Sequence, residues 1–130
     1  SLNDLPFKVN SVGRVSDLNK LARLYNAADV FIAPSLEDNL PNTVMESLSC
    51  GTPVVAFEIG GMPDMIEHKV TGYLAKSESV DDLTEGIFWV LNDKNRLNDL
   101  RVNSRKKALE NFTDEVVAQK YINFYKTLLK

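Results

Sequence analysis

The sequence predicts an α/β fold with an open parallel sheet and flanking helices. Short apolar runs, such as DVFIA at residues 29–33 and PVVAF at residues 53–57, alternate with stretches whose apolar residues recur at helical spacing. This alternation is typical of βαβ units around a parallel sheet. The chain has 130 residues, of which 44% are hydrophobic and 25% charged, which is ordinary for a single globular domain.

Four short strands are expected along the chain. The first covers residues 9–12 and ends at Gly13. The runs at residues 29–33 and 53–57 are continuously apolar, as in strands that are buried on both faces, and Gly72–Ala75 is the last strand. In an open parallel sheet, ligands bind beyond the carboxyl ends of the strands. The loops that follow the four strands are therefore the candidate site loops.

About six helices are expected to flank this sheet. Ser16 is a suitable N-cap for the first helix, and Gly51 stops the second, at residues 43–50, where helices favour glycine. Pro63 begins a short helix that runs to about His68. The last three helices are predicted at Val80–Leu91 with Ser79 as N-cap, at residues 96–110, and at residues 114–129 with Thr113 as N-cap.

Composition and charge exclude several classes of function. The net charge of −3 argues against nucleic acid as a partner, because phosphate backbones need clustered lysine and arginine. Cys50 is the single cysteine, which rules out an internal disulfide and fits a reducing, cytoplasmic location. With His68 as the single histidine, no cluster of thiolates and imidazoles is available for zinc. Metal chemistry, if any, would have to use carboxylates, and neither a signal peptide nor a membrane span is visible.

Residues 34–51 carry the pattern that suggests a ligand. A polar loop with Asp38 follows a buried strand, and a helix begins near Asn42 or Thr43. Free N–H groups and the dipole at the start of such a helix form a natural anion site. Asp38 precedes the helix, and Glu46 lies in its first turn. Carboxylates in these positions can accept hydrogen bonds from sugar hydroxyls while the N–H groups hold phosphate, which suits a nucleotide-sugar.

Structural explanations for the same residues stay open. Thr43 and Glu46 match a T-x-x-E capping box, in which the glutamate bonds back to the N-cap N–H, and Asp38 alone would be a turn residue. Cys50 is expected to be a small buried apolar group, and Trp89 to lie in the core or at a domain contact. A solvated helix face, with contact to a membrane surface as the alternative, is expected for Arg101, Arg105, Lys106 and Lys107.

Residues 34–51 resemble the acidic-x7-acidic motif of the retaining glycosyltransferases of family four, the glycosyl transferases group 1. Other stretches resemble this family in the same order: NSVGRV and LARLYNAADVFIAPS before the motif, and ESLSCGTPVVAFEIGGMPDMIEHKVTGYLA after its start. The resemblance covers residues 9–125. It implies a Rossmann-like domain, the carboxy-terminal half of a GT-B fold, so that residues 1–130 form a single, partial, donor-binding domain.

By this resemblance, Glu46 binds the ribose hydroxyls of the nucleotide, and Asp38 binds hydroxyls of the transferred sugar. The backbone of residues 39–43 meets the diphosphate, and the turn at residues 13–15 lies against the base. The donor-binding residues implied in this way are Gly13, Arg14, Val15, Asp38, Asn39, Leu40, Pro41, Asn42, Thr43 and Glu46. The sequence departs from the family at Asp38, where glutamate is usual, and Glu37 stands just before it. No catalytic residue can be named, and the resemblance implies no metal or other cofactor.

The resemblance also implies a reaction and its setting. A hexosyl group would pass from a UDP- or GDP-sugar to a sugar or lipid-linked acceptor, with retention at the anomeric carbon, in polysaccharide or glycoconjugate biosynthesis. The expected location is the cytoplasm, with peripheral membrane contact as a further expectation. The alternatives are a nucleotide-sugar epimerase of the same fold, a non-catalytic nucleotide-sugar-binding module and a flavodoxin-like regulatory domain.

In the family, three features precede the matched region: the acceptor domain, a basic pair that neutralises the diphosphate, and the first two strands of the donor domain. The 130 residues alone are therefore expected to be inactive and to bind UDP or GDP no better than roughly millimolar, about 4 kcal/mol. The strand at residues 9–12 would lack its neighbours in the sheet. It is expected to rearrange, to pair with another copy of the chain, or to stay loosely attached.

Overall fold

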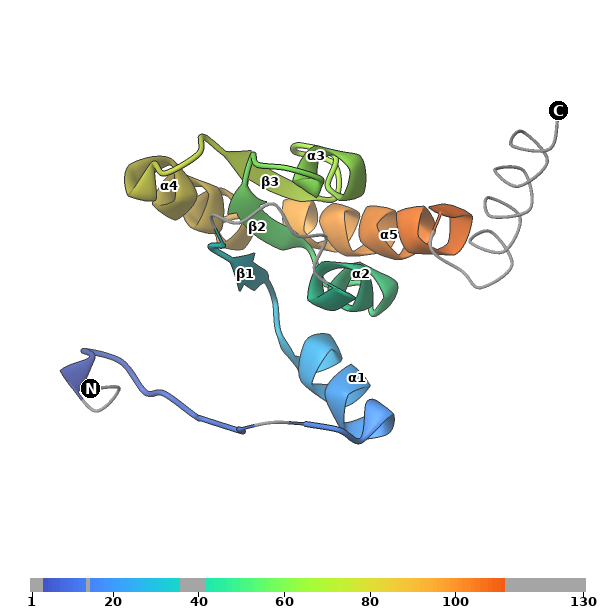
Figure 1. The fold of residues 1–130 in the computed structure, drawn as a ribbon. Helices are drawn as coiled ribbons and strands as arrows, with labels where there is room; N and C mark the ends of the chain where they lie inside the picture. The colour runs from blue at the N-terminus through green and yellow to red at the C-terminus, as the bar shows by residue number, and fades with distance from the viewer. Residues whose placement is uncertain (1–3, 14, 36–41, 112–130) are drawn as a thin grey trace, which may run out of the picture.

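The computed structural model describes residues 4–13, 15–35 and 42–111. Within these ranges, three parallel strands and five helices form an α/β unit (Figure 1). In chain order, the elements are α1 (Leu18–Ala27), β1 (Phe31–Ala33), α2 (Asn42–Ser49), β2 (Val54–Phe57), α3 (Met62–Met65), β3 (Gly72–Ala75), α4 (Val80–Leu91) and α5 (Lys94–Asn111). The strands lie side by side in the order β1-β2-β3. The predicted open parallel sheet with flanking helices is confirmed.

The sheet has a hydrophobic core on each face. Ile32, Val55 and Tyr73 are neighbours across the strands and point to one face, while Ala33 and Ala56 point to the other. Helix α4 packs on the face with Val55 and Tyr73, and helices α2 and α3 pack on the opposite face. Helix α5 contributes buried residues to both cores. The two cores fix the helices relative to the carboxyl ends of the strands.

The strands differ in how deeply they are buried. All four residues of β2 are buried, which confirms the buried strand predicted at residues 53–57. The prediction that the run at residues 29–33 is buried on both faces is wrong. Ile32 is 40% exposed, because β1 lies at the edge of the described sheet with β2 as its neighbour on one side.

The strand predicted at residues 9–12 is not formed. Val12 is 52% exposed, and Figure 1 shows the segment before α1 lying apart from the sheet. A strand is stable only when its backbone groups pair with a neighbour and its side chains join a core. Residues 9–12 take no part in the sheet that the structure describes. Pairing of this segment with another copy of the chain stays a prediction, because the structure describes a single chain.

Local capping sets several helix ends. Ser79 accepts a hydrogen bond from the N–H of Asp82 at 3.1 Å, which confirms the predicted cap and bounds of α4. Helix α1 is capped by Asp17 rather than by Ser16, because the Asp17 carboxylate accepts hydrogen bonds from the N–H groups two and three residues later. Helix α5 begins at Lys94 rather than at residue 96.

Three other helix predictions have different outcomes. Gly51 follows α2 with φ of +74°, a backbone conformation that glycine adopts without strain, so the predicted stop is confirmed. Helix α3 ends at Met65, so His68 lies beyond the helix, where it forms an isolated β-bridge with Gly72, rather than at a helix end. The helix predicted at residues 114–129 lies outside the described residues.

Candidate functional site

Part of the predicted site lies outside the described residues. The positions concerned are Arg14, Glu37, Asp38, Asn39, Leu40 and Pro41. The structure does place Asn42, Thr43 and Glu46 on α2, and Gly13 and Val15 in the segment before α1. These five positions can be compared with the predictions.

Helix α2 begins one residue too early for the predicted capping box. Its first residue is Asn42, so Thr43 lies inside the helix and cannot be the N-cap. Glu46 accordingly lies in the second turn rather than the first. Its Oε2 atom accepts a hydrogen bond from the hydroxyl of Tyr25 at 3.2 Å. The glutamate side chain is thereby directed towards α1.

A cavity of about 360 Å³ lies between α1 and α2. Its walls are mostly apolar, with the Glu46 carboxylate and the Tyr25 hydroxyl among a few polar groups. The residues that line it are Leu18, Leu21, Ala22, Tyr25, Asn42, Met45, Glu46, Ser49 and Cys50. A concave apolar pocket with a small number of polar groups is the usual form of a small-molecule site. Two predicted site residues, Asn42 and Glu46, therefore lie on one cavity.

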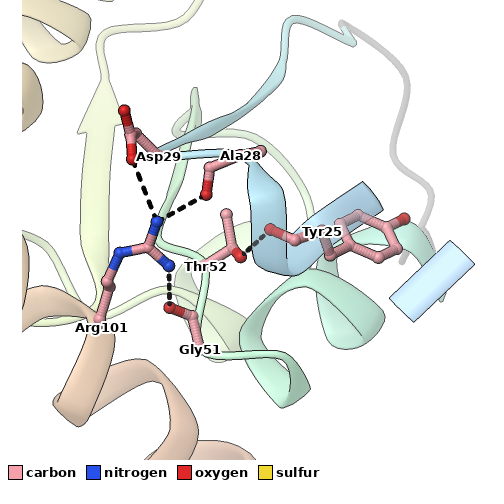
Figure 2. Close-up of polar contacts among 6 residues, drawn as sticks. All are labelled: Tyr25, Ala28, Asp29, Gly51, Thr52 and Arg101. Atoms are coloured by element: carbon pink, nitrogen blue, oxygen red, sulfur yellow. Dashed lines mark hydrogen bonds and ion pairs between the residues drawn. The ribbon is translucent and has the colours of Figure 1, made fainter. Parts of the chain in front are cut away.

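Tyr25 is held firmly at the wall of this cavity. Its side chain is only 7% exposed, and its ring packs edge-on against Phe31, with 5.6 Å between the ring centroids. Its backbone carbonyl accepts a hydrogen bond from the buried hydroxyl of Thr52 at 2.6 Å (Figure 2). Burial, followed by the nearby charge of Glu46, raises the pKa of Tyr25 to about 12. The phenol therefore remains a hydrogen-bond donor at neutral pH.

Gly13 and Val15 are not brought to the cavity. Neither residue is among those that line it. Gly13 has φ of +64°, which glycine tolerates, and its segment lies apart from the sheet (Figure 1). Contact of the turn at residues 13–15 with a base therefore stays a prediction.

Arg101 does not belong to a solvated helix face, contrary to the prediction. Its Nη2 atom donates to the carbonyl of Ala28 at 2.8 Å and to Oδ1 of Asp29 at 3.2 Å, and Nη1 donates to the carbonyl of Gly51 at 3.4 Å (Figure 2). One guanidinium thus connects α5 to the segments that lead into β1 and β2. Arg105, one turn later on α5, donates to the carbonyl of Ser49 at the end of α2. Spacing of four residues could have suggested that the two arginines share a face.

Cys50 is half-buried rather than fully buried, because it lines the cavity between α1 and α2. Burial raises the pKa of its thiol, and the nearby charge of Arg105 only partly opposes this effect. The thiol stays protonated at neutral pH. Burial therefore disfavours the thiolate form at this position.

A second polar cluster lies where β3 ends. The hydroxyl of Tyr73 and the N–H of Lys76 each donate to the carboxylate of Asp82, at 2.7 Å. These two hydrogen bonds, the backbone one first, lower the pKa of Asp82, and the bond to Asp82 is the main reason that the pKa of Tyr73 rises to about 12. His68 is exposed, and its Nδ1 atom accepts a hydrogen bond from the N–H of Leu74 at 3.0 Å. These bonds fasten β3 to α4 and to the preceding turn.

Trp89 packs on the core beside this cluster, as predicted. It is half-buried, with its ring centroid 6.0 Å from that of Tyr73 and 4.5 Å from the guanidinium carbon of Arg96. Among the described residues, no group of three acidic, histidine or cysteine side chains could hold a metal ion. No helix in that part of the chain is long and apolar enough to cross a membrane.

Comparison with known proteins defines the family. Residues 4–107 match the family described as "Glycosyl transferases group 1", and the chain belongs to this family. A D-inositol 3-phosphate glycosyltransferase of Kribbella flavida is 33% identical over 110 residues, which cover 82% of this chain and 25% of that protein. An uncharacterized glycosyltransferase of Methanocaldococcus jannaschii is 29% identical over 110 residues, covering 85% of this chain and 28% of that protein.

Solved structures agree on the fold. Sucrose-phosphate synthase from Thermosynechococcus elongatus superposes with a TM-score of 0.80 at 30% identity, covering 91% of this chain and 29% of that one. Anabaena HepE, solved in complex with UDP, superposes with a TM-score of 0.74 at 24% identity, covering 81% of this chain and 29% of that one. The fold is the Rossmann-like α/β fold of GT-B glycosyltransferases. The chain spans less than a third of the length of these relatives.

Proposed function

We propose that this chain is the donor-binding part of a longer, retaining glycosyltransferase of family four. The observation that carries the proposal is the position of Glu46, a carboxylate at the wall of a 360 Å³ cavity on a helix that follows a strand end. Family membership and relatives named as glycosyltransferases support it. The longer enzyme would transfer a hexosyl group to a sugar or lipid-linked acceptor held by another domain.

In this proposal, each part of the donor has its own contacts. Glu46 binds the ribose hydroxyls, and the N–H groups at the start of α2, including those of Asn42 and Thr43, meet the diphosphate. Asp38 binds the transferred sugar, and residues 13–15 lie against the base. The donor is a UDP- or GDP-sugar, and no metal or other cofactor takes part. A solved relative that contains UDP supports this choice of donor.

Magnitudes limit what the 130 residues can do alone. A helix N-terminus stabilises an anion by roughly 0.3–1 kcal/mol, or up to about 2 kcal/mol when partly buried. Hydrogen bonds to a charged group contribute about 1.5–3 kcal/mol each. Their sum is close to the roughly 4 kcal/mol of millimolar binding. We therefore expect the chain alone to bind UDP weakly and to transfer no sugar.

Titration of the chain with UDP, followed by NMR, tests the donor site. We expect a dissociation constant of roughly 1 mM for the wild type and about tenfold weaker binding for Glu46→Ala, because one charged acceptor is lost. Glu85→Ala is the matched control, since it removes an exposed glutamate from α4. Micromolar affinity would contradict the weak-binding expectation, and equal affinities of wild type and Glu46→Ala would overturn the donor role of Glu46.

The reaction itself is tested in the longer enzyme. Glu46→Ala should lower kcat/KM for the nucleotide-sugar, and the product should keep the anomeric configuration of the donor. Full activity of this variant would contradict its donor role. A product in which the sugar remains on the nucleotide with an inverted stereocentre would identify an epimerase instead, and the absence of any turnover would identify a non-catalytic binding module.

A further inference from the structure

We infer that Tyr25 is a positioning residue that orients the Glu46 carboxylate for a vicinal diol of the ligand. The inference rests on the proposed function, because it gives Glu46 a ligand with hydroxyl pairs. Its basis is the 3.2 Å hydrogen bond from the Tyr25 hydroxyl to Oε2 of Glu46 at the wall of the cavity. The two side chains come from different helices, α1 and α2.

Tyr25, which donates the hydrogen bond, is held in place by several contacts. Tyr25 is buried, its ring meets the edge of Phe31 on β1, and its carbonyl accepts a hydrogen bond from Thr52. Thr52 is itself fully buried just before β2. Tyr25 is thus anchored to β1 and to the segment before β2 through contacts that do not involve its hydroxyl. Loss of the hydroxyl alone should leave this anchoring intact.

The Glu46 carboxylate, which accepts the hydrogen bond, gains a defined orientation from this contact. A glutamate on a helix surface has several rotatable bonds, and ordering it lowers its conformational entropy. A carboxylate offers about four lone-pair sites, of which the tyrosine hydroxyl uses one. The remaining sites can accept hydrogen bonds from two adjacent hydroxyls at once. A carboxylate that is already oriented by Tyr25 loses less entropy when the diol binds.

The pair therefore predicts a preference for ribose over deoxyribose. A nucleotide with both the 2′ and 3′ hydroxyls can donate to both sides of the carboxylate, whereas a 2′-deoxynucleotide can donate only once. Tyr25→Phe keeps the ring and removes the hydroxyl, so it should reduce this preference rather than abolish the site. Tyr73→Phe is the matched control, because Tyr73 also donates to a carboxylate but lies at the end of β3.

The experiment measures dissociation constants of UDP and 2′-deoxy-UDP by NMR titration of the 130-residue chain. We expect Tyr25→Phe to weaken UDP binding about fivefold, the value of one net hydrogen bond, and to leave 2′-deoxy-UDP binding nearly unchanged. Tyr73→Phe should keep the wild-type ratio. Thermal unfolding of each variant is measured alongside, since a purely structural role would lower Tm without changing the ratio.

A double-mutant cycle separates the possible failures. If Tyr25 acts through Glu46, Tyr25→Phe should have no further effect on UDP binding in the Glu46→Ala background, because alanine leaves no acceptor for the tyrosine hydroxyl. An equal effect in both backgrounds, or an unchanged ratio in Tyr25→Phe, overturns the positioning role while leaving the donor site standing. If Glu46→Ala binds UDP like the wild type, the proposed function itself fails. If Tyr25→Phe does not fold, Glu46→Asp breaks the same hydrogen bond, and an unchanged ratio there overturns the inference.

Discussion

The part of the chain from α2 to α5, residues 42–111, is packed far more deeply than the N-terminal part, residues 4–35. In residues 42–111, β2 is buried along its whole length, and most members of both hydrophobic cores come from this part of the chain. Large apolar side chains are exposed in both parts, including Leu5, Phe7, Val9, Val12, Leu18 and Ile32 in residues 4–35. Of the described hydrophobic residues in that N-terminal part, only Tyr25 and Ala33 are buried, against fifteen in residues 42–111. Both parts contain a short apolar run that predicts a buried strand. The difference in burial must therefore come from what surrounds each strand.

Strand neighbours explain most of this contrast. β2 has a strand on each side and helices on both faces, whereas β1 has one strand beside it in the described sheet. Parallel strands are typically buried on both faces, and apolar residues on an edge strand keep part of their surface in water. The cavity with Glu46 lies between the two parts, since α1 forms one wall and α2 the other. Its geometry depends on how well the N-terminal part is held.

Two isoleucines test the contrast directly, with the largest expected effect. Ile66 is fully buried in the core beneath α2 and α3, and Ile32 on β1 is 40% exposed. Ile66→Ala should lower the free energy of unfolding by about 2–5 kcal/mol, the usual cost of a cavity in a packed core. Ile32→Ala should lower it by about 1 kcal/mol or less. Urea denaturation of both variants checks this, and equal losses would mean that β1 is packed as firmly as the rest.

Arg101 should be the main link between the two parts. Arg101→Met keeps the length of the side chain but removes the donors to Ala28, Asp29 and Gly51. We expect a loss of about 1–3 kcal/mol in the free energy of unfolding, because hydrogen bonds to a charged donor are replaced by none. Hydrogen exchange at the N–H of Phe31, which bonds to the carbonyl of Pro53, should accelerate more than exchange within α4.

The control for Arg101 is the exposed half of its ion pair. Asp29 is 65% exposed, so Asp29→Asn should change the free energy of unfolding by only about 0.5 kcal/mol. The carbonyl acceptors at Ala28 and Gly51 would then account for most of the effect. If Asp29→Asn destabilises the chain as much as Arg101→Met, the ion pair rather than the backbone bonds connects the two parts.

Local patterns were sufficient to predict the features that depend on local chemistry. The continuous apolar run predicted β2, and a serine before Val80 predicted the start of α4. Burial of β1 and pairing of residues 9–12 could not be predicted, because they depend on neighbours elsewhere in the sheet. The role of Arg101 joins positions 73 residues apart, and no local pattern encodes such a contact.

In the candidate site, too, the features that depend on local sequence were predicted and the long-range contacts were not. The sequence predicted that Glu46 lies on a helix after a strand, and the structure places it on α2 beside a cavity. Its contact with Tyr25 could not be predicted, since it requires the packing of α1 against α2, 21 residues apart in the chain. Asp38 lies outside the described residues, so its role stays a prediction.

The last comparison concerns two tyrosines, one in each part. Tyr25 and Tyr73 both have a pKa raised from 10.0 to about 12. A raised pKa in the folded state means that the unfolded chain loses these protons first. Their contribution to stability is therefore complete below pH 10 and is lost as the pH rises from 10 to about 12. The causes differ, because burial dominates for Tyr25 and the hydrogen bond to Asp82 dominates for Tyr73.

Removal of each carboxylate should separate these causes. Asp82→Asn should return the pKa of Tyr73 most of the way towards its ordinary value, since the main cause is then gone. Glu46→Gln should lower the pKa of Tyr25 by less, because the ring stays buried. Carbon-13 NMR of labelled tyrosine rings follows each residue separately through the alkaline range. A larger shift for Tyr25 than for Tyr73 would mean that the charge of Glu46, rather than burial, controls the pKa of the tyrosine at the cavity wall.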